Sequence, residues 1–163
     1  MRLRNHIDLI SGYTPFSEDD ARAIFRELTE AVQHCHEHYV VLRSINLDNI
    51  ALERSPVTGR LCVKLADLSE AVMNSDTSSV VDHPLFAWSK VNFLSPEILQ
   101  RELYTYPSDI WSLGVVLYAL LSGTVPFHSE IDDHLIHAIK VSFTCLSIVS
   151  FLIVQIGLFF SII

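Results

Sequence analysis

Three histidines at alternate positions, His34, His36 and His38, form the densest group of side chains that could bind a metal ion. In a helix, His34 and His38 would lie on one face, as two ligands of a zinc ion do. The H-E-x-x-H pattern of zinc enzymes also has a Glu after its first His. Cys35 stands there instead. The spacing therefore predicts a solvated helix end rather than a metal site.

A Gly-rich cradle for phosphate groups cannot be found in the sequence. The five glycines, at positions 12, 59, 114, 123 and 157, lie nine or more residues apart. Neither G-x-G-x-x-G nor a P-loop can be written anywhere along the chain. Three cysteines, Cys35, Cys62 and Cys145, are too few and too scattered for a disulfide framework. This cysteine usage favours a reducing compartment.

The net charge of the chain is negative, and every charged residue lies within residues 1–140. The 163 residues include 11 Lys and Arg against 19 Asp and Glu, for a net charge of −8, which argues against a nucleic-acid partner. No charged residue follows Lys140. As a helix, residues 141–163 would measure about 34 Å, against about 30 Å for the hydrocarbon core of a bilayer. The sequence predicts one domain, residues 1–140, and a candidate transmembrane helix, residues 141–163.

Such a tail would make the protein a single-pass, C-terminally anchored membrane protein with a cytoplasmic domain. The alternative is that residues 141–163 are a non-native continuation, such as a gene model that runs past an exon end. In that case the protein is expected to be cytoplasmic.

Helical and strand patterns alternate over short distances before residue 140, which predicts one α+β domain that is mainly α-helical. Ser17 precedes three acidic residues and predicts a helix start. Apolar residues then recur every three or four positions, so the helix should end near His38. Residues 49–52 and 61–65 predict the two strands of a hairpin around a turn-rich segment.

The second half of the domain is expected to contain a long polar segment and two helices. Residues 69–90 predict a functional loop. Ser108 and Asp109 are expected to cap a helix that is apolar on every side and ends at Ser122–Gly123. Ser129 is expected to cap a last, amphipathic helix, with its inner positions at Ile131, Leu135, Ile136 and Ile139.

Four short stretches, in this order, carry the strongest motif signal: VVLRSINLDNI, VKLADLSEA, NFLSPEIL and SDIWSLGVVLYALLSGTVPF. Together they resemble the large lobe of a eukaryotic protein kinase, closest to the calcium/calmodulin-dependent Ser/Thr branch, over roughly residues 3–140. The resemblance implies a degenerate and truncated large lobe that lacks the small lobe and the last helices. It also implies that residues 69–90 are the activation segment.

In this family the catalytic loop reads H-R-D-L-x-x-x-N, with a Lys two positions after the Asp in Ser/Thr kinases. The Asp accepts the proton of the substrate hydroxyl. The matching stretch, residues 42–49, keeps Arg43 and Asn49 but holds Leu42 at the His position, Ser44 at the base position and Asn46 at the Lys position. A hydroxyl does not accept a proton at neutral pH as a carboxylate does. The resemblance therefore predicts that no catalytic residue is intact.

By the same resemblance, Asn49 and Asp67 stand at the two Mg²⁺-binding positions, the second within a D-F-G motif that reads Asp67-Leu68-Ser69. Leu68 is expected to fill the apolar slot of the family's Phe. In the alternative interpretation, Asn49 and Asp67 are ordinary polar residues that end short strands. No cofactor is expected for the chain as written, because the small lobe's Gly-rich loop, Lys and Glu are missing. Mg-ATP is expected if a separate small lobe supplies them.

Four residues are expected to have structural or regulatory roles by resemblance. Glu97 matches the Glu of the A-P-E motif and is expected to be unpaired. Asp109 is expected to accept backbone N–H bonds from the catalytic loop, and Trp111 matches the buried central helix. Arg43 remains as a candidate partner for a phosphate on the activation segment.

The sequence thus predicts a protein-kinase-like protein that is catalytically inactive, a pseudokinase fragment that acts as a binding or scaffold module. A protein partner is expected to cover the lobe surface that the small lobe would cover. The alternative, from a different class, is a fragment of an ATP-dependent Ser/Thr protein kinase whose small lobe is missing from this chain.

Overall fold

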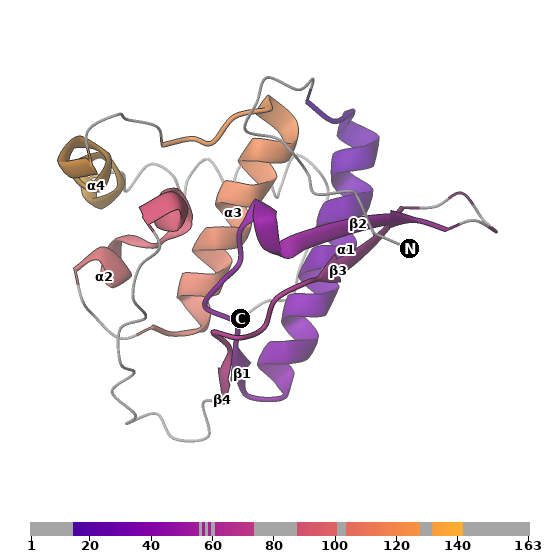
Figure 1. The fold of residues 1–163 in the computed structure, drawn as a ribbon, viewed down its shortest axis with the longest axis horizontal. Coiled ribbons are helices and arrows are strands. Elements are labelled where there is room, and N and C mark those ends of the chain that lie inside the picture. Colours follow the sequence, from indigo (N-terminus) through magenta and orange to yellow (C-terminus); the bar gives the residue numbers. More distant parts are fainter. Residues whose placement is uncertain are drawn as a thin grey trace.

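Helices make up most of the fold, together with two small antiparallel sheets (Figure 1). This arrangement confirms the predicted α+β class, mainly α-helical. The computed structural model describes residues 15–55, 57, 59, 61–73, 88–100, 104–127 and 132–141. Residues 74–87 of the predicted activation segment, the predicted cap Ser129 and the predicted inner position Ile131 lie outside these ranges.

Helix α1, Glu18–Glu37, begins and ends where the sequence predicts. The Ser17 hydroxyl accepts a hydrogen bond from the Asp20 N–H at 3.2 Å, and the acidic first turn faces the positive end of the helix dipole. The helix stops because Tyr39 has a φ of 60°, which a continuing helix does not allow. Its inner face is buried through the following residues: Ala21, Ile24, Phe25, Leu28, Thr29 and Val32.

Helix α3, Tyr106–Ser122, lies beside α1 (Figure 1). It is buried along almost its whole length. It ends at Gly123, whose φ of 76° suits a residue without a Cβ, so the predicted end is confirmed. The predicted start is wrong. The cap residue is Thr105, and Pro107 lies in the first turn, where its fixed φ and missing N–H are tolerated. Ser108 and Asp109 are therefore inside the helix.

The hairpin consists of strands β2, Ile50–Arg54, and β3, Leu61–Leu65, paired with Ile50 opposite Leu65. The second strand has the predicted bounds, and the first begins one residue later and extends further than predicted. In Figure 1 the hairpin crosses α1, and the Glu27 carboxylate of α1 accepts the Val63 N–H at 2.8 Å. This bond satisfies a backbone donor at the outer edge of β3.

A second sheet pairs β1, Val40–Val41, with β4, Val72–Met73, and was not predicted. Three short helical segments complete the central part of the fold: η2 (Leu47–Asn49), η3 (Trp88–Phe93) and α2 (Pro96–Leu99). The main core lies between α1, α3 and the hairpin. The β1–β4 sheet lies beside the ends of α1 and α3, at the lower edge of Figure 1.

Helix α4, Asp132–Val141, contacts α2 and η3. Leu135 and Ile139 are buried and Ile136 is partly buried, as the amphipathic pattern predicts. Within the described ranges, no helix combines the length and the apolar composition needed to cross a membrane. The predicted transmembrane helix, residues 141–163, lies outside those ranges except for Val141, which ends α4.

Candidate functional site

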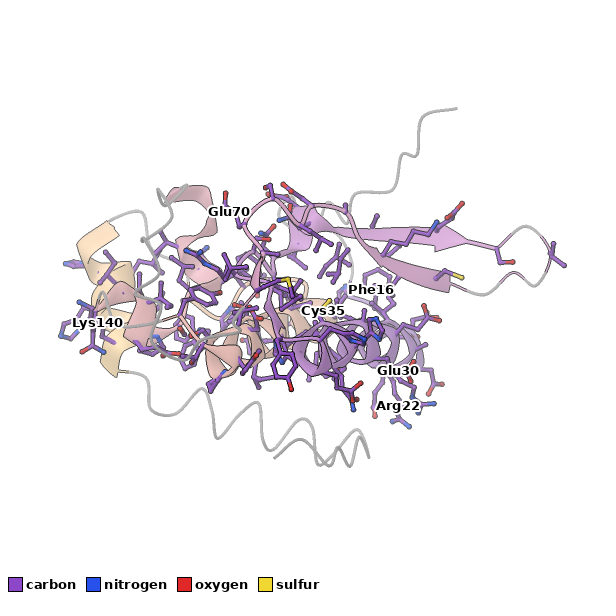
Figure 2. The ribbon with its side chains drawn as sticks, turned by 90° about the horizontal axis from the view of Figure 1, so that it is seen from below. Phe16, Arg22, Glu30, Cys35, Glu70 and Lys140 are labelled. Atoms are coloured by element: carbon purple, nitrogen blue, oxygen red, sulfur yellow. The ribbon has the colours of Figure 1, made fainter. Side chains whose placement is uncertain are left out.

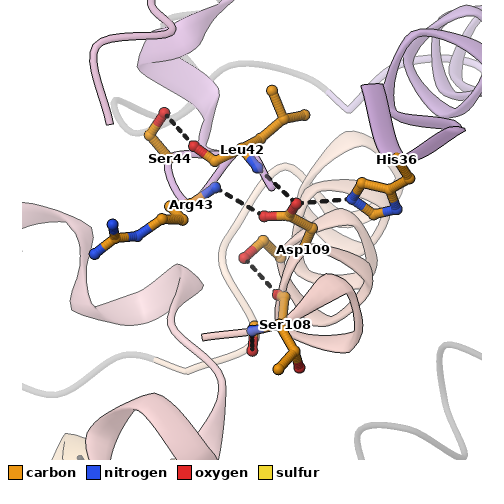
Figure 3. A network of polar contacts seen from close by, with 8 residues as sticks. His36, Leu42, Arg43, Ser44, Ser108 and Asp109 are labelled. Carbon is orange, nitrogen blue, oxygen red and sulfur yellow. Dashed lines mark hydrogen bonds and ion pairs between the residues drawn. The ribbon is translucent and has the colours of Figure 1, made fainter. Parts of the chain in front are cut away.

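Asp109 connects α3 to the start of the loop that matches the catalytic loop (Figure 3). Its carboxylate accepts the N–H of Leu42 and the N–H of Arg43, each at 2.9 Å, and its exposed fraction is 0%. The hydrogen bonds expected of Asp109 are therefore present. Arg43 has a φ of 65°, a conformation that costs an L-residue about 1–3 kcal/mol. The two bonds to one carboxylate offset this cost and fix the direction of the loop.

His36 is the third partner of Asp109. Its Nε2 faces the carboxylate (Figure 3), at a distance of 2.8 Å. The side chain of His36 is only 16% exposed. The predicted solvated helix end is therefore wrong for His36, because this side chain faces α3. The helical spacing contained the signal, since His36 lies four residues after the buried Val32. The ring centroids of His36 and Tyr106 lie 4.8 Å apart.

Arg43 lies in the interior rather than in solvent. Its side chain is 9% exposed, and its guanidinium carbon lies 5.6 Å from the ring centroid of the buried Tyr104. This is a cation–π contact. Burial, with a smaller effect of the Asp109 charge, raises the pKa of the Tyr104 hydroxyl well above its usual range. The predicted phosphate partner of Arg43 falls within residues outside the described ranges.

The hydroxyl of Ser44, at the family's base position, makes two long hydrogen bonds. It donates to the carbonyls of Leu42 and Asp67, both at 3.4 Å. The side chain is half-buried beside the backbone of Asp67. A neutral hydroxyl at this position can orient or donate, but it cannot hold a proton taken from a substrate.

The side chain of Asn46, at the family's Lys position, forms its hydrogen bonds within the loop itself. It is 2% exposed, and its amide oxygen accepts the N–H groups of Asp48 at 3.0 Å and Asn49 at 3.2 Å. Its amide nitrogen donates to the Ser44 carbonyl at 2.8 Å. Asn46 therefore caps the short helix η2, a role for which Asn is well suited and Lys is not. Its residue type was the signal for this role.

Asn49 and Asp67 lie at the neighbouring inner ends of β2 and β3, since the Ala66 N–H donates to the Asn49 carbonyl at 2.8 Å. The Asn49 side-chain nitrogen donates to the Ser44 carbonyl at 2.9 Å, so its amide oxygen is directed away from that bond. Asp67 is exposed and accepts the Ser69 N–H at 2.9 Å. Amide and carboxylate oxygens are suitable ligands for Mg²⁺, so the two side chains fit part of a magnesium site. Across the described ranges, no group of three or more ligand side chains is arranged to hold a metal ion.

Leu68 does not fill an apolar slot, contrary to the expectation from the D-F-G motif. It is 51% exposed. The Asp67 side chain closes a turn with the Ser69 N–H, and this turn leaves Leu68 outside the core. The sequence pattern could not predict this, because a local side-chain bond decides the direction of Leu68.

Glu97 was expected to be unpaired because the family's Arg partner is missing, and in the structure it accepts a hydrogen bond from a neutral side chain. The Ser108 hydroxyl, which is fully buried, donates to its carboxylate at 2.8 Å. The misplaced start of α3 hid this bond, because Ser108 was expected outside the helix as its cap. Trp111 is 8% exposed and stacks on Phe127 with 6.0 Å between ring centroids, so its buried position in the central helix is confirmed.

Comparison with known families matches residues 1–153 to the protein kinase domain. The serine/threonine protein kinase OSK3 of Oryza sativa subsp. indica is 36% identical over 124 residues, which are 76% of this chain and 23% of that protein. The carbon catabolite-derepressing protein kinase of Secale cereale is 33% identical over 135 residues, which are 82% of this chain and 25% of that protein. The chain thus spans about a quarter of the length of these relatives. The matched range also extends past the predicted domain boundary at Lys140.

Proposed function

Since the chain belongs to the family of protein kinase domains, we propose that it is a catalytically inactive member of the Ser/Thr branch that serves as a binding or scaffold module. The observation that carries this proposal is the loop from Leu42 to Asn49. It keeps the folded shape that its hydrogen bonds to Asp109 and Asn46 define, and it lacks a carboxylate at the base position. The likeness to the calcium/calmodulin-dependent branch remains part of this proposal.

The lack of a base removes a specific contribution to phosphoryl transfer. A positioned general base contributes about 10²–10⁴ in rate, and Ser44 cannot supply it. Asp48 does not take over this role, because it lies in η2 four residues further on with an exposed side chain. Since phosphoryl transfer depends mainly on positioning and charge stabilisation, the change of Lys to Asn46 adds to the loss.

The chain keeps two side chains that match the family's Mg²⁺-binding positions, so nucleotide binding needs a test of its own. Asn49 and Asp67 would hold the ion of Mg-ATP, and the ion would neutralise charge on the phosphates. The 163 residues contain no Gly-rich loop to enclose those phosphates. We therefore propose that this chain by itself binds nucleotide weakly or not at all and works without a cofactor.

A phosphotransfer assay tests the inactivity. The purified full chain, incubated with radiolabelled ATP, Mg²⁺ and general protein substrates, is expected to transfer no label above the level of a heat-denatured sample. Transfer that disappears in the Asp67→Asn variant would overturn the proposal, because it would originate at this site rather than from a contaminating kinase.

Thermal unfolding in the presence of Mg-ATP tests nucleotide binding separately. A ligand at 100 times its dissociation constant stabilises the folded state by about 2.7 kcal/mol, which would raise the melting temperature by several degrees. We expect no such shift. A shift of several degrees that Asp67→Asn removes would show specific nucleotide binding and would count against a chain without a cofactor.

The second candidate function is that of a fragment of an active Ser/Thr kinase, and two observations favour it. Both Mg²⁺ positions are kept, and the relatives that cover three quarters or more of this chain are named as protein kinases. A chimera that adds the small lobe of an active Ser/Thr kinase distinguishes the two. Activity of the unaltered chimera supports the second candidate. An inactive chimera that gains activity with Ser44→Asp and Asn46→Lys supports the inactive member.

We also propose that a protein partner covers exposed apolar side chains near the site. Leu68 is 51% exposed and Met73 is 70% exposed, and both lie in the segment that follows β3. Contiguous apolar patches mark binding surfaces, and these two side chains are proposed to belong to one such patch. Replacing both residues with Ser is expected to abolish partner binding without loss of stability, and unchanged binding would count against this surface.

The membrane anchor remains a proposal, supported by the apolar composition of residues 141–163. Alkaline extraction of membranes from cells that produce the full chain provides the test. We expect the protein to stay in the membrane pellet. Complete release into the supernatant would contradict the anchor and favour a cytoplasmic protein.

A further inference from the structure

The last turn of α1 presents two histidine rings to solvent on one face. His34 and His38 are four residues apart, which places them on neighbouring turns. Both are exposed, and their ring centroids lie 4.3 Å apart with an angle of 42° between the ring planes. Two nitrogens that share a metal ion, each about 2.0–2.1 Å from it, lie within roughly 4 Å of each other. The two rings lie side by side, so one ion can reach a nitrogen of each ring.

A backbone hydrogen bond orients one of the two rings. The Nδ1 of His38 lies 2.8 Å from the carbonyl oxygen of His34. Because a carbonyl oxygen only accepts, Nδ1 carries the proton, and in the neutral ring Nε2 keeps its lone pair. Metal-binding histidines are commonly oriented in this way, with the second ring nitrogen donating to a carbonyl or carboxylate.

The surroundings of His34 and His38 carry negative charge, which favours a bound cation. His36 is not part of this pair. The carboxyl end of a helix carries a partial negative charge, and His38 is the cap of the 20-residue helix α1. Glu30, four residues before His34, is also exposed and lies on the outer side of α1 (Figure 2). His36, in contrast, faces Asp109 and the interior.

We propose that His34 and His38 form a two-histidine site for one divalent transition-metal ion of the Zn²⁺ type. Imidazole nitrogen suits Zn²⁺, Cu²⁺ and Ni²⁺, whereas Mg²⁺ and Ca²⁺ prefer oxygen ligands. Water completes the coordination in the isolated chain. The site is separate from the loop at Ser44 and does not depend on whether the protein transfers phosphate.

Calorimetric titration of the untagged full chain with Zn²⁺ tests the site, in the presence of a reductant that does not bind metals. We expect His34→Gln and His38→Gln each to lower the Zn²⁺ affinity by about tenfold or more, because one of two ligands is lost. His134→Gln is the matched control, since His134 is an exposed helical histidine in α4, and it should leave the affinity unchanged. Equal affinity in all four proteins would overturn the proposal, as would an equal loss in His134→Gln.

Nuclear magnetic resonance of the histidine rings identifies the ligands independently of affinity. On addition of Zn²⁺, the ring-proton signals of His34 and His38 should shift together, while those of His36 should not. The same addition of Mg²⁺ should shift none of them. If Zn²⁺ shifts neither His34 nor His38, or if binding disappears in a Cys62→Ser variant, the site lies elsewhere and the proposal is wrong.

Discussion

The two ends of the loop that matches the catalytic loop are held in different ways. At its start, Leu42 and Arg43 are bound by Asp109, which lies 67 and 66 residues further along the chain. At its end, residues 44–49 are held by the side chains of Asn46 and Asn49 within the loop itself. The first connection fixes the loop to the buried helix α3. The second closes the loop on its own backbone.

This difference separates the framework, the residues that hold the loop in place, from the positions that would act on a substrate. Two of the residues that fix the loop to α3 match the family, Arg43 in the H-R-D motif and Asp109 by resemblance, while the third, Leu42, stands at the His position and binds through its backbone N–H. The positions that would act on a substrate hold Ser44, with long hydrogen bonds, and Asn46, which caps η2. A loop can therefore keep the kinase shape without the groups that perform the transfer. Variants at each end test this division.

The largest effect is expected from Asp109→Ala. This change leaves two buried backbone N–H groups and His36 without their acceptor, so the free energy of unfolding should fall by about 3–5 kcal/mol. Urea unfolding of the full chain, followed by circular dichroism, measures it. Asp109→Asn, which keeps one acceptor, should lose less if Asp109→Ala fails to fold.

Asp48→Asn is the matched control, because this exposed carboxylate lies in the same loop and should change stability by no more than about 0.5 kcal/mol. If Asp109→Asn and Asp48→Asn have the same small effect, the connection to α3 does not hold the loop, and the comparison of the two ends fails.

A smaller effect is expected at the other end of the loop. Asn46→Ala removes a cap acceptor for two N–H groups and should lower the free energy of unfolding by about 1–2 kcal/mol. Asn46→Lys, which restores the family residue, should be destabilising as well, because Lys has no acceptor. Urea unfolding measures both. A neutral Asn46→Lys would mean that the loop does not need its internal cap.

The pH dependence of stability reports on the framework near Arg43. Burial raises the pKa of Tyr104 above that of an exposed tyrosine, so the folded chain keeps a proton that the unfolded chain loses. The resulting stability is fully present below about pH 10 and falls above it, by roughly 1 kcal/mol at pH 11. Tyr104→Phe should therefore lose less stability between pH 9 and pH 11 than the unaltered chain.

Tyr39→Phe is the control for this measurement, because Tyr39 is 64% exposed. It should retain the pH dependence of the unaltered chain. An identical decline in Tyr104→Phe would show that the alkaline loss of stability has another origin.

Local signals predicted much of the fold. Ser17 and the apolar stripe determined α1, and the left-handed Gly123 determined the end of α3. The start of α3 was misplaced because Thr105 and Pro107 were not recognised as its first-turn signals. The β1–β4 sheet could not be predicted, since each strand has two residues and its pairing depends on contacts between distant segments.

The role of a site residue could be predicted where its residue type has one main role. Its hydrogen-bond partner was missed where that partner depends on how separate helices pack together. The family resemblance predicted the backbone bonds of Asp109. It did not predict that His36, 73 residues earlier, would reach the same carboxylate. The bond between Ser108 and Glu97 was missed for the same reason, because it depends on how α2 and α3 meet.

The smallest effect on stability is expected at Ser44. This residue gives the clearest test of whether a position in the catalytic loop also helps to hold the loop in place. The hydrogen bonds of its hydroxyl are both 3.4 Å long, and these are the bonds that Ser44→Ala removes, so this change should alter the free energy of unfolding by no more than about 0.5 kcal/mol. Urea unfolding measures this, with Asn46→Ala as the destabilised reference. A loss as large as that of Asn46→Ala would mean that the base position has acquired a structural role. Ser44 would then belong to the framework, and restoring an Asp there would disturb the loop instead of completing it.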